Sequence, residues 1–197
     1  SAQGANFRVM EFHGSTAKAM PTSSRLVLSN MSVEAGATAG IFPADEETVR
    51  YLREEAGVTD ELEMVVPDAD AQYEKVIEID VSKLEPQVAC PHTVDNVKPI
   101  GSVEGRKVDQ IVIGSCTNGR LDDIEIAARI LKGKKIARNA RMLVFPASGR
   151  IDREALERGY IQTLMEAGAV VMNSGCGCCL GVHQGALADG EVALSTT

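Results

Sequence analysis

The sequence predicts an α/β fold built on parallel sheets, arranged in three-layer α/β/α domains, and three observations support this class. Short apolar strands alternate with helices through the second half of the chain, which is the pattern of parallel sheets joined by helical crossovers. The chain has 197 residues, of which 44% are hydrophobic, so it can bury a substantial core. Aromatic residues make up only 4%, whereas Gly and Ala are plentiful, as suits layers packed through small side chains.

The first half contains two predicted strands and two predicted helical segments. Residues 7–12 (FRVMEF) have the composition of a strand, and apolar residues in 23–36 follow helical spacing. A helix begins at Asp45, which two further acidic residues follow in the first turn, and it ends at Gly57. Residues 76–81 (VIEIDV) alternate like a strand with one exposed face.

The second half alternates regularly between strands and helices. Strands are predicted at 108–113 and 142–145, with a helix at 121–131 between them. A second helix at 151–167 leads to a third strand at 169–172. We therefore expect a βαβαβ unit with right-handed crossovers and a parallel sheet.

A Pro-bearing stretch separates the two patterns, and we place a domain boundary there. Residues 1–97 are predicted to form one α/β domain, and residues 98–197 form the βαβαβ domain. The second domain is expected to be truncated at its C-terminal end.

Charge and hydropathy argue against several partners. A formal net charge of -8 disfavours binding to nucleic acid or to an anionic membrane surface. We find no basic stretch followed by an apolar segment, as in a secretory signal, and no apolar run long enough to cross a bilayer. We therefore expect a cytoplasmic protein without nucleic-acid or membrane partners.

Five cysteines are spaced unlike a disulfide framework. Three of them crowd into residues 176–179 (CGCC), while Cys116 and Cys90 stand alone. Such clustering points to metal or redox chemistry in a reducing compartment. We interpret Cys90 as a small apolar filler, and His13 and His92 as structural or surface residues.

The predicted strands carry three of the cysteines to one edge of the sheet. Cys116 directly follows the strand at 108–113, and Cys176 and Cys179 follow the strand at 169–172. In a parallel sheet, ligands bind outside the carboxyl ends of the strands. We therefore expect these three thiols to emerge at the same edge.

The number of cysteine ligands limits which kind of metal site is possible but leaves more than one alternative. A structural zinc site takes four ligands, and an electron-transfer cluster usually has four cysteines. Three cysteines would leave one iron open to act as a Lewis acid. Cys178 leaves this count open, because it can serve as a fourth ligand or as part of a non-catalytic zinc or redox module with Cys176 and Cys179.

Two motifs in order resemble those of the aconitase superfamily. The words GSCTNGR at 114–120 and SGCGCCLGVHQG at 174–185 are similar to the first-cysteine and paired-cysteine motifs of that family. Their wording is nearest to the large subunits of 3-isopropylmalate dehydratase and homoaconitase. The similarity also covers VMEFHG at 9–14, SNMSVEAGATAGIFPADEET at 29–48, PHTVDNV at 91–97 and GEVALST at 190–196.

The resemblance implies a set of roles. Cys116, Cys176 and Cys179 would bind a [4Fe–4S] cluster, and Glu11 matches an active-site glutamate of the family. His183 is either a hydrogen-bonding neighbour of the cluster or an ordinary loop residue. The implied reaction is a hydro-lyase isomerisation, in which a hydroxy di- or tricarboxylic acid is dehydrated and rehydrated. The first expectation is 3-isopropylmalate dehydratase of leucine biosynthesis, and the alternatives are homoaconitase or an aconitase-type subunit for another substrate.

The resemblance also implies what this chain does not supply. The family's large subunit is longer, so the chain resembles an internal fragment. In the family, the catalytic base that removes the proton from the substrate is a serine on a separate swivel domain or small subunit. We therefore expect a small-subunit partner in a heterodimer or heterotetramer, a small hydroxy acid as substrate, and no activity from the chain by itself.

Overall fold

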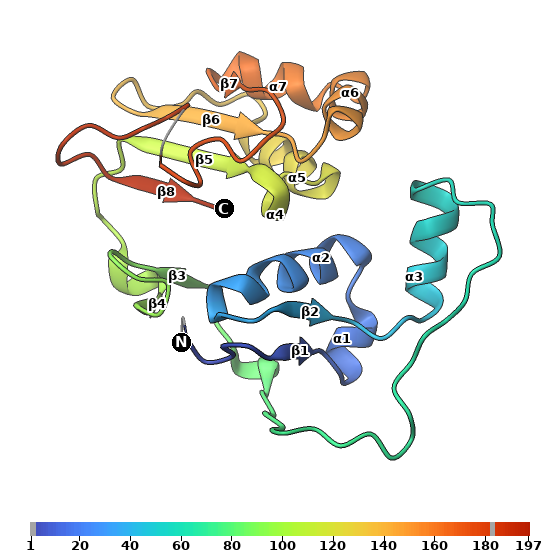
Figure 1. Ribbon diagram of the computed structural model, residues 1–197. Helices are drawn as coiled ribbons and strands as arrows, with labels where there is room; N and C mark the ends of the chain where they lie inside the picture. Colours follow the sequence, from blue (N-terminus) through green and yellow to red (C-terminus); the bar gives the residue numbers. More distant parts are fainter. Residues whose placement is uncertain (1–2, 182–183) are drawn as a thin grey trace. The chain divides into compact units, whose positions relative to one another are not determined.

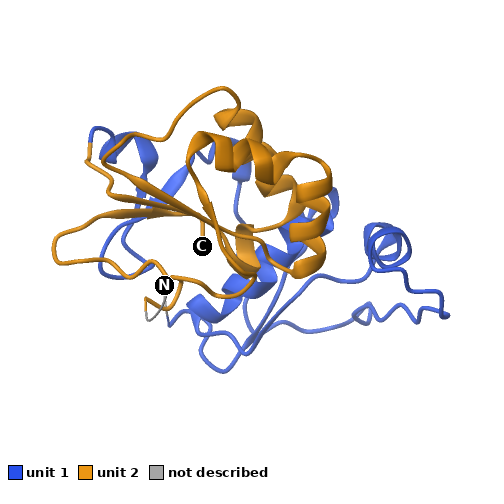
Figure 2. Ribbon diagram, turned by 90° about the horizontal axis from the view of Figure 1, so that it is seen from above, with its two compact units in different colours: residues 1–105 blue, residues 106–197 orange. Residues whose placement is uncertain are grey.

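The computed structural model describes residues 3–181 and 184–197, and the chain divides into two compact units, residues 1–105 and 106–197 (Figure 2). Each unit combines helices with a pair or sheet of parallel strands, so the predicted α/β class is confirmed. The domain boundary after residue 97 stays a prediction. No helix in the described part of the chain is long and apolar enough to span a membrane.

Unit 1 is built around a parallel pair of strands. Strand β1 (Val9–Glu11) pairs with β2 (Ala39–Ile41). The chain between them forms α1 (Ser15–Ala19), α2 (Thr22–Met31) and a 3-10 turn (Ser32–Ala35), as Figure 1 shows. A Cβ on Gly40 would lie 2.2 Å from the Ser32 Oγ, so this glycine lets β2 approach the end of the helical segment.

The predicted helix start at Asp45 is confirmed, and it is held by a buried arginine. Asp45 caps α3 (Glu46–Arg50), where the Thr48 amide donates to the Asp45 Oδ1 at 3.1 Å, and the helix continues as a π-helical turn (Tyr51–Glu55). Arg25, a residue that is only 5% exposed, donates to both carboxylate oxygens of Asp45 at 2.7 and 2.8 Å. These hydrogen bonds from Arg25 lower the pKa of Asp45.

The strand predicted at 76–81 is wrong. Residues 76–80 are irregular, a 3-10 turn follows at Val81–Lys83, and Val76, Ile77 and Ile79 are 73%, 69% and 72% exposed. Alternation alone does not make a strand, because its amides and carbonyls need a neighbouring strand to pair with. The stretch after it instead forms a hairpin that the sequence did not predict, with β3 (Gln87–Ala89) antiparallel to β4 (Val97–Pro99), followed by a 3-10 turn (Ile100–Val103).

Unit 2 contains a four-stranded sheet in the order β7-β6-β5-β8, with every pair parallel. Its strands are β5 (Gln110–Gly114), β6 (Arg141–Phe145), β7 (Val170–Val171) and β8 (Ala193–Ser195). The first three agree with the predicted βαβαβ pattern. Strand β8 was missed, and it adds the C-terminal end of the chain to the edge beside β5 (Figure 1).

The helices of unit 2 are α4 (Ser115–Asn118), α5 (Leu121–Leu131), α6 (Gly149–Glu157) and α7 (Tyr160–Ala167). The single helix predicted at 151–167 is therefore wrong, since the segment contains two. Gly159 separates them with φ of 76°, a left-handed conformation that ends a helix. Ser148 caps α6 by accepting a hydrogen bond from the Ile151 amide at 3.3 Å.

The sheet of unit 2 is buried on both faces. Along β6, Met142 and Val144 face the cluster that includes Ile124 of α5 and Leu164 of α7. Leu143 and Phe145 face the other way and pack with Val112, Met172 and Cys178. In the described residues, helices cover one face, and the segment that follows β7 covers the other.

Two leucine-to-alanine variants, one at a buried and one at an exposed position, test the packing of the helices on the sheet of unit 2. We expect Leu164→Ala to destabilise unit 2 by about 2–5 kcal/mol, because it removes a side chain that is 0% exposed and leaves a cavity. The matched change Leu156→Ala, at a side chain 59% exposed, should change stability by less than about 0.5 kcal/mol. Hydrogen exchange of the β5 and β6 amides measures both, and equal effects would contradict this packing.

Candidate functional site

Cys116 is presented at a sharp turn between β5 and α4. Gly114 has φ of 126°, and a Cβ placed on it would lie 2.0 Å from the Phe145 carbonyl oxygen, so only glycine fits there. The next residue, Ser115, takes a left-handed φ of 63°. The turn buries Ser115 and Thr117 and leaves the Cys116 side chain exposed.

Hydrogen bonds fix the turn on both sides. The Gly114 amide donates to the Thr196 Oγ1 at 3.1 Å, and the Asn118 side-chain amide donates to the Thr196 carbonyl. On the other side, the Arg120 Nη2 donates to the Cys116 carbonyl at 3.0 Å. The residues just after β8 and the start of α5 therefore both hold the Cys116 backbone.

Three buried polar atoms around Cys116 have no partner within the described residues. They are the Ser115 Oγ, the Thr117 Oγ1 and the Arg120 Nε. Buried donors are normally satisfied, so three unsatisfied donors within residues 115–120 can serve an anionic group. Cluster sulfurs accept such hydrogen bonds, which tune the cluster.

The second cysteine segment forms a tight turn with one thiol on the sheet side. The Cys179 amide donates to the Cys176 carbonyl at 3.0 Å, and the buried Gly177 is so close to the Phe145 ring that a Cβ would lie 2.5 Å from it. Cys176 and Cys179 are exposed. Cys178 is half-buried and packs with Leu143 and its neighbours, and burial raises the pKa of its thiol. Three exposed thiols and one inward-facing thiol favour three ligands over four.

The sheet order brings both cysteine segments to its carboxyl edge. Strands β5 and β7 flank β6, so the two segments start about 10 Å apart, which is two strand spacings. The described residues contain no group of three or more Cys, His, Asp or Glu side chains arranged to hold a metal ion. The donor types fit an iron–sulfur cluster, and the convergence of Cys116, Cys176 and Cys179 on one cluster stays a prediction.

Glu11 belongs to unit 1, where it ends β1 beside a histidine. The His13 Nε2 lies 2.9 Å from the Glu11 Oε1, and the Tyr73 hydroxyl lies 3.3 Å from the same nitrogen. Glu11, His13, Tyr73 and Lys75 line a cavity of about 520 Å³. Partial burial and then the negative charge of Glu11 raise the pKa of Tyr73. His13 therefore contacts a candidate catalytic residue, although sequence reasoning interpreted it as structural or surface.

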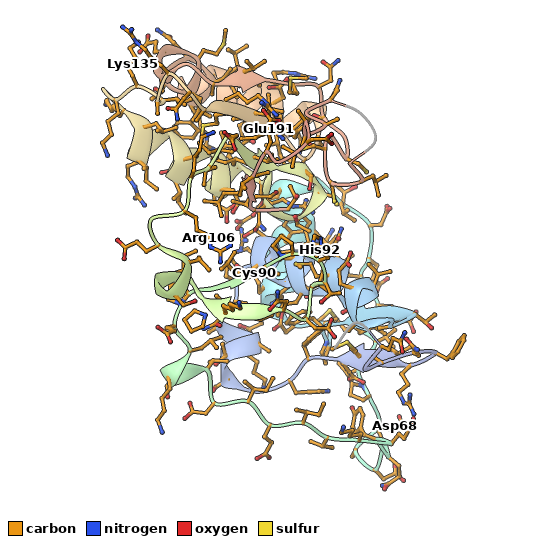
Figure 3. All side chains as sticks on the ribbon, turned by 90° about the vertical axis from the view of Figure 1, so that its left-hand side faces the viewer. Asp68, Cys90, His92, Arg106, Lys135 and Glu191 are labelled. Atoms are coloured by element: carbon orange, nitrogen blue, oxygen red, sulfur yellow. The ribbon has the colours of Figure 1, made fainter. Side chains whose placement is uncertain are left out.

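Three further residues complete the set considered from sequence, and of these His92 is exposed. Cys90, labelled in Figure 3, is half-buried in unit 1, where its amide donates to the Asn96 carbonyl at 2.9 Å. His183 lies outside the described residues.

Sequence reasoning missed a polar network at the amino ends of β5 and β6. It joins Gln110, Arg141 and Glu191 through hydrogen bonds of 2.6–2.7 Å. The available signal was a glutamine inside the otherwise apolar strand around residues 110–114, since a buried amide must find partners.

Comparisons with known proteins agree with the motifs at this site. A model of the aconitase family (aconitate hydratase) matches residues 1–106 and 98–197. The chain is 52% identical over 193 residues to "3-isopropylmalate dehydratase large subunit 2" of Archaeoglobus fulgidus, covering 98% of this chain and 46% of that protein.

Two other relatives carry related names. The 3-isopropylmalate dehydratase large subunit of Elusimicrobium minutum is 51% identical, over 99% of this chain and 46% of that protein. The methanogen homoaconitase large subunit of Methanocaldococcus jannaschii is 46% identical, over 99% of this chain and 48% of that protein. The chain thus spans about half the length of the relatives it matches.

Gly114 provides a test of the Cys116 turn. We expect Gly114→Ala to destabilise unit 2 by about 2 kcal/mol or more, because the new Cβ would collide with the Phe145 carbonyl. Gly149→Ala is the control, since nothing lies within 4 Å of the Cβ it would add, and it should change stability by less than about 1 kcal/mol. Hydrogen exchange of the β5 and β6 amides measures the stability of both variants. If Gly114→Ala left the stability unchanged, the close approach of Gly114 to the Phe145 carbonyl would be contradicted.

Tyr73 reports on the Glu11 cavity. In a Tyr51→Phe, Tyr160→Phe background, ultraviolet titration follows the Tyr73 phenol alone. We expect its pKa to lie above about 10 and to fall with Glu11→Gln, because the carboxylate disfavours the phenolate. Glu78→Gln, at another residue that lines the cavity, is the control and should change it less. Identical titrations in all variants would show that Glu11 and Tyr73 do not interact.

Proposed function

Because this chain belongs to the aconitase family, we propose that it forms the cluster-binding part of the large subunit of an iron–sulfur hydro-lyase. The complete protein would isomerise a hydroxy di- or tricarboxylic acid by dehydration and rehydration. The names of the two most identical relatives described above favour 3-isopropylmalate, and hence leucine biosynthesis. The homoaconitase relative, at 46% identity, keeps a homoaconitate-type substrate as the alternative.

The observation that carries the proposal is the exposure of the thiols. Cys116, Cys176 and Cys179 are exposed on two segments at the carboxyl edge of one parallel sheet, whereas Cys178 faces the sheet. This is the edge at which α/β sheets bind ligands. A structural zinc site would use all four ligand positions, and the inward-facing Cys178 argues against it.

Each residue would have a distinct task in this enzyme. The thiolates of Cys116, Cys176 and Cys179 would hold a [4Fe–4S] cluster. When bound, such a cluster has one iron with a free position, which supplies Lewis-acid polarisation of a hydroxyl group. Glu11 would present its carboxylate to the substrate hydroxyl, and His13, 2.9 Å from its Oε1, would orient that carboxylate.

The proposal includes a second polypeptide. The relatives are called large subunits, and this supports a small-subunit partner in a heterodimer or heterotetramer. Since the chain spans about half of those relatives, we propose that it has no turnover by itself. We propose a cytoplasmic setting, and the net charge of -8 disfavours nucleic acid or an anionic membrane as a partner.

Electron paramagnetic resonance tests the cluster. The chain is purified without oxygen, reconstituted with iron and sulfide, and mildly oxidised. We expect a [3Fe–4S]-type signal, because the iron without a cysteine ligand is the one that leaves. The variant Cys116→Ser should lose the signal, and the matched variant Cys178→Ala should keep it, since Cys178 faces the sheet.

Each other outcome has a defined meaning. Bound zinc without iron in the parent chain would replace the hydro-lyase proposal with a zinc module. A signal lost in Cys178→Ala but kept in Cys116→Ser would give the third ligand position to Cys178 and contradict the assignment.

A further inference from the structure

We propose that Gln110, Arg141 and Glu191 are positioning residues for the second cysteine segment, which they hold against the sheet through Gly185. No comparison assigns a role to these three residues. The proposal deepens the hydro-lyase function and rests on it for its purpose, but the contacts that carry it concern unit 2 alone.

Gln110 is the centre of the network. It opens β5, is 1% exposed, and uses both ends of its amide. Its Nε2 donates to the Gly185 carbonyl at 2.7 Å, and its Oε1 accepts from the Arg141 Nε at 2.6 Å. A buried amide costs stability unless it is hydrogen-bonded, so both of these bonds are needed for Gln110 to remain inside.

Arg141 and Glu191 secure the outer end of the network. Arg141 faces Gln110 in the register of β6 and β5. Its Nη1 and Nη2 donate to the two carboxylate oxygens of Glu191 at 2.7 and 2.6 Å, a paired geometry that is both strong and directional. Glu191, labelled in Figure 3, also accepts from the Ala188 amide at 2.8 Å, which closes the turn before β8. The hydrogen bonds from Arg141 and Ala188 lower the pKa of Glu191 to about 2, so its carboxylate stays charged near neutrality.

Gly185 connects the hydrogen-bonded network to the cysteine segment, because it lies close to both Gln110 and Cys178. It has φ of 94°, and a Cβ on it would lie 2.4 Å from the Leu143 Cδ1, 3.2 Å from the Gln110 Nε2 and 3.3 Å from the Cys178 Cβ. The backbone at Gly185 therefore fits between the sheet, Gln110 and Cys178. A displaced Gly185 would release Cys178 from the sheet.

The position of Cys178 in turn sets that of the ligand candidates. Cys176 and Cys179 lie two residues before it and one after it, within the turn closed by the Cys179 amide and the Cys176 carbonyl. While Cys178 packs against the cluster of Val112, Leu143 and Phe145, Cys176 and Cys179 remain exposed. The network thus fixes which of the three clustered thiols face outward.

Alkylation of the metal-free chain tests the network. The five cysteines are pulse-labelled with iodoacetamide and assigned by peptide mass spectrometry. We expect Gln110→Leu to speed labelling of Cys178 by about tenfold or more, because local opening of the segment becomes easier. Labelling of Cys116 and Cys90 should change less than about twofold, since neither touches the network.

The controls separate positioning from general destabilisation. Gln162→Leu makes the same change on the exposed side of α7 and should leave all rates unchanged. Glu191→Gln keeps the shape and should accelerate Cys178 less than Gln110→Leu does. Should Gln110→Leu not fold, Glu191→Gln and Gly185→Ala decide in its place. Unchanged labelling of Cys178 in every folded network variant, or equal acceleration of all five cysteines, would overturn the proposal.

Reconstitution distinguishes this proposal from the function on which it rests. If the parent binds iron and sulfide, the network variants should lose iron faster than Gln162→Leu does. If the parent binds no cluster, the proposed function fails, while the alkylation pattern still decides whether the network positions the cysteine segment.

Discussion

Both cysteine segments depend on close contact with Phe145, the last residue of the inner strand β6. Gly114 and Gly119 approach its carbonyl oxygen so closely that a Cβ would lie 2.0 and 2.4 Å away, and Gly177 lies against its ring. The Phe145 side chain is 0% exposed, because the Gly177 segment covers the sheet face that the helices leave open. Two segments about 60 residues apart in sequence therefore take their positions from one residue, through glycines that permit close approach.

Much of unit 2 could be predicted because its signals are local. The apolar run at β5 and the helical periodicity of α5 are complete within a few residues. The wrong predictions arose where the structure depends on pairing with another strand or on a residue with positive φ. Residues 76–81 alternate correctly but have no paired neighbour in the described chain, and β8 is a strand because β5 accepts it at an edge. Gly159 breaks an otherwise continuous apolar pattern through a positive φ that periodicity does not reveal.

The site divides in the same way. The sequence alone reveals the motifs that carry Cys116, Cys176, Cys179 and Glu11. It does not reveal the contacts of these motifs, because the hydrogen bond from Gln110 to Gly185 joins residues 75 positions apart. Cys178 illustrates the limit, since its sequence neighbours made it a candidate ligand and only its packing against the cluster that contains Leu143 gives it a packing role. Burial is a property of the folded sheet, so no local pattern contains it.

Apolar contact alone would leave the covering segment poorly placed. Burying Cys178 against the cluster that contains Leu143 favours contact, but hydrophobic burial has no direction and would allow the segment to slide by small amounts. A hydrogen bond has direction and length, and the bond from the Gln110 amide to the Gly185 carbonyl fixes the segment at one position along the strand. The paired bonds from Arg141 to Glu191 then anchor that amide at the amino end of the sheet. The sheet thus holds the segment by packing near its carboxyl end and by polar contacts near its amino end, which limits the freedom of the turn that carries Cys176 and Cys179.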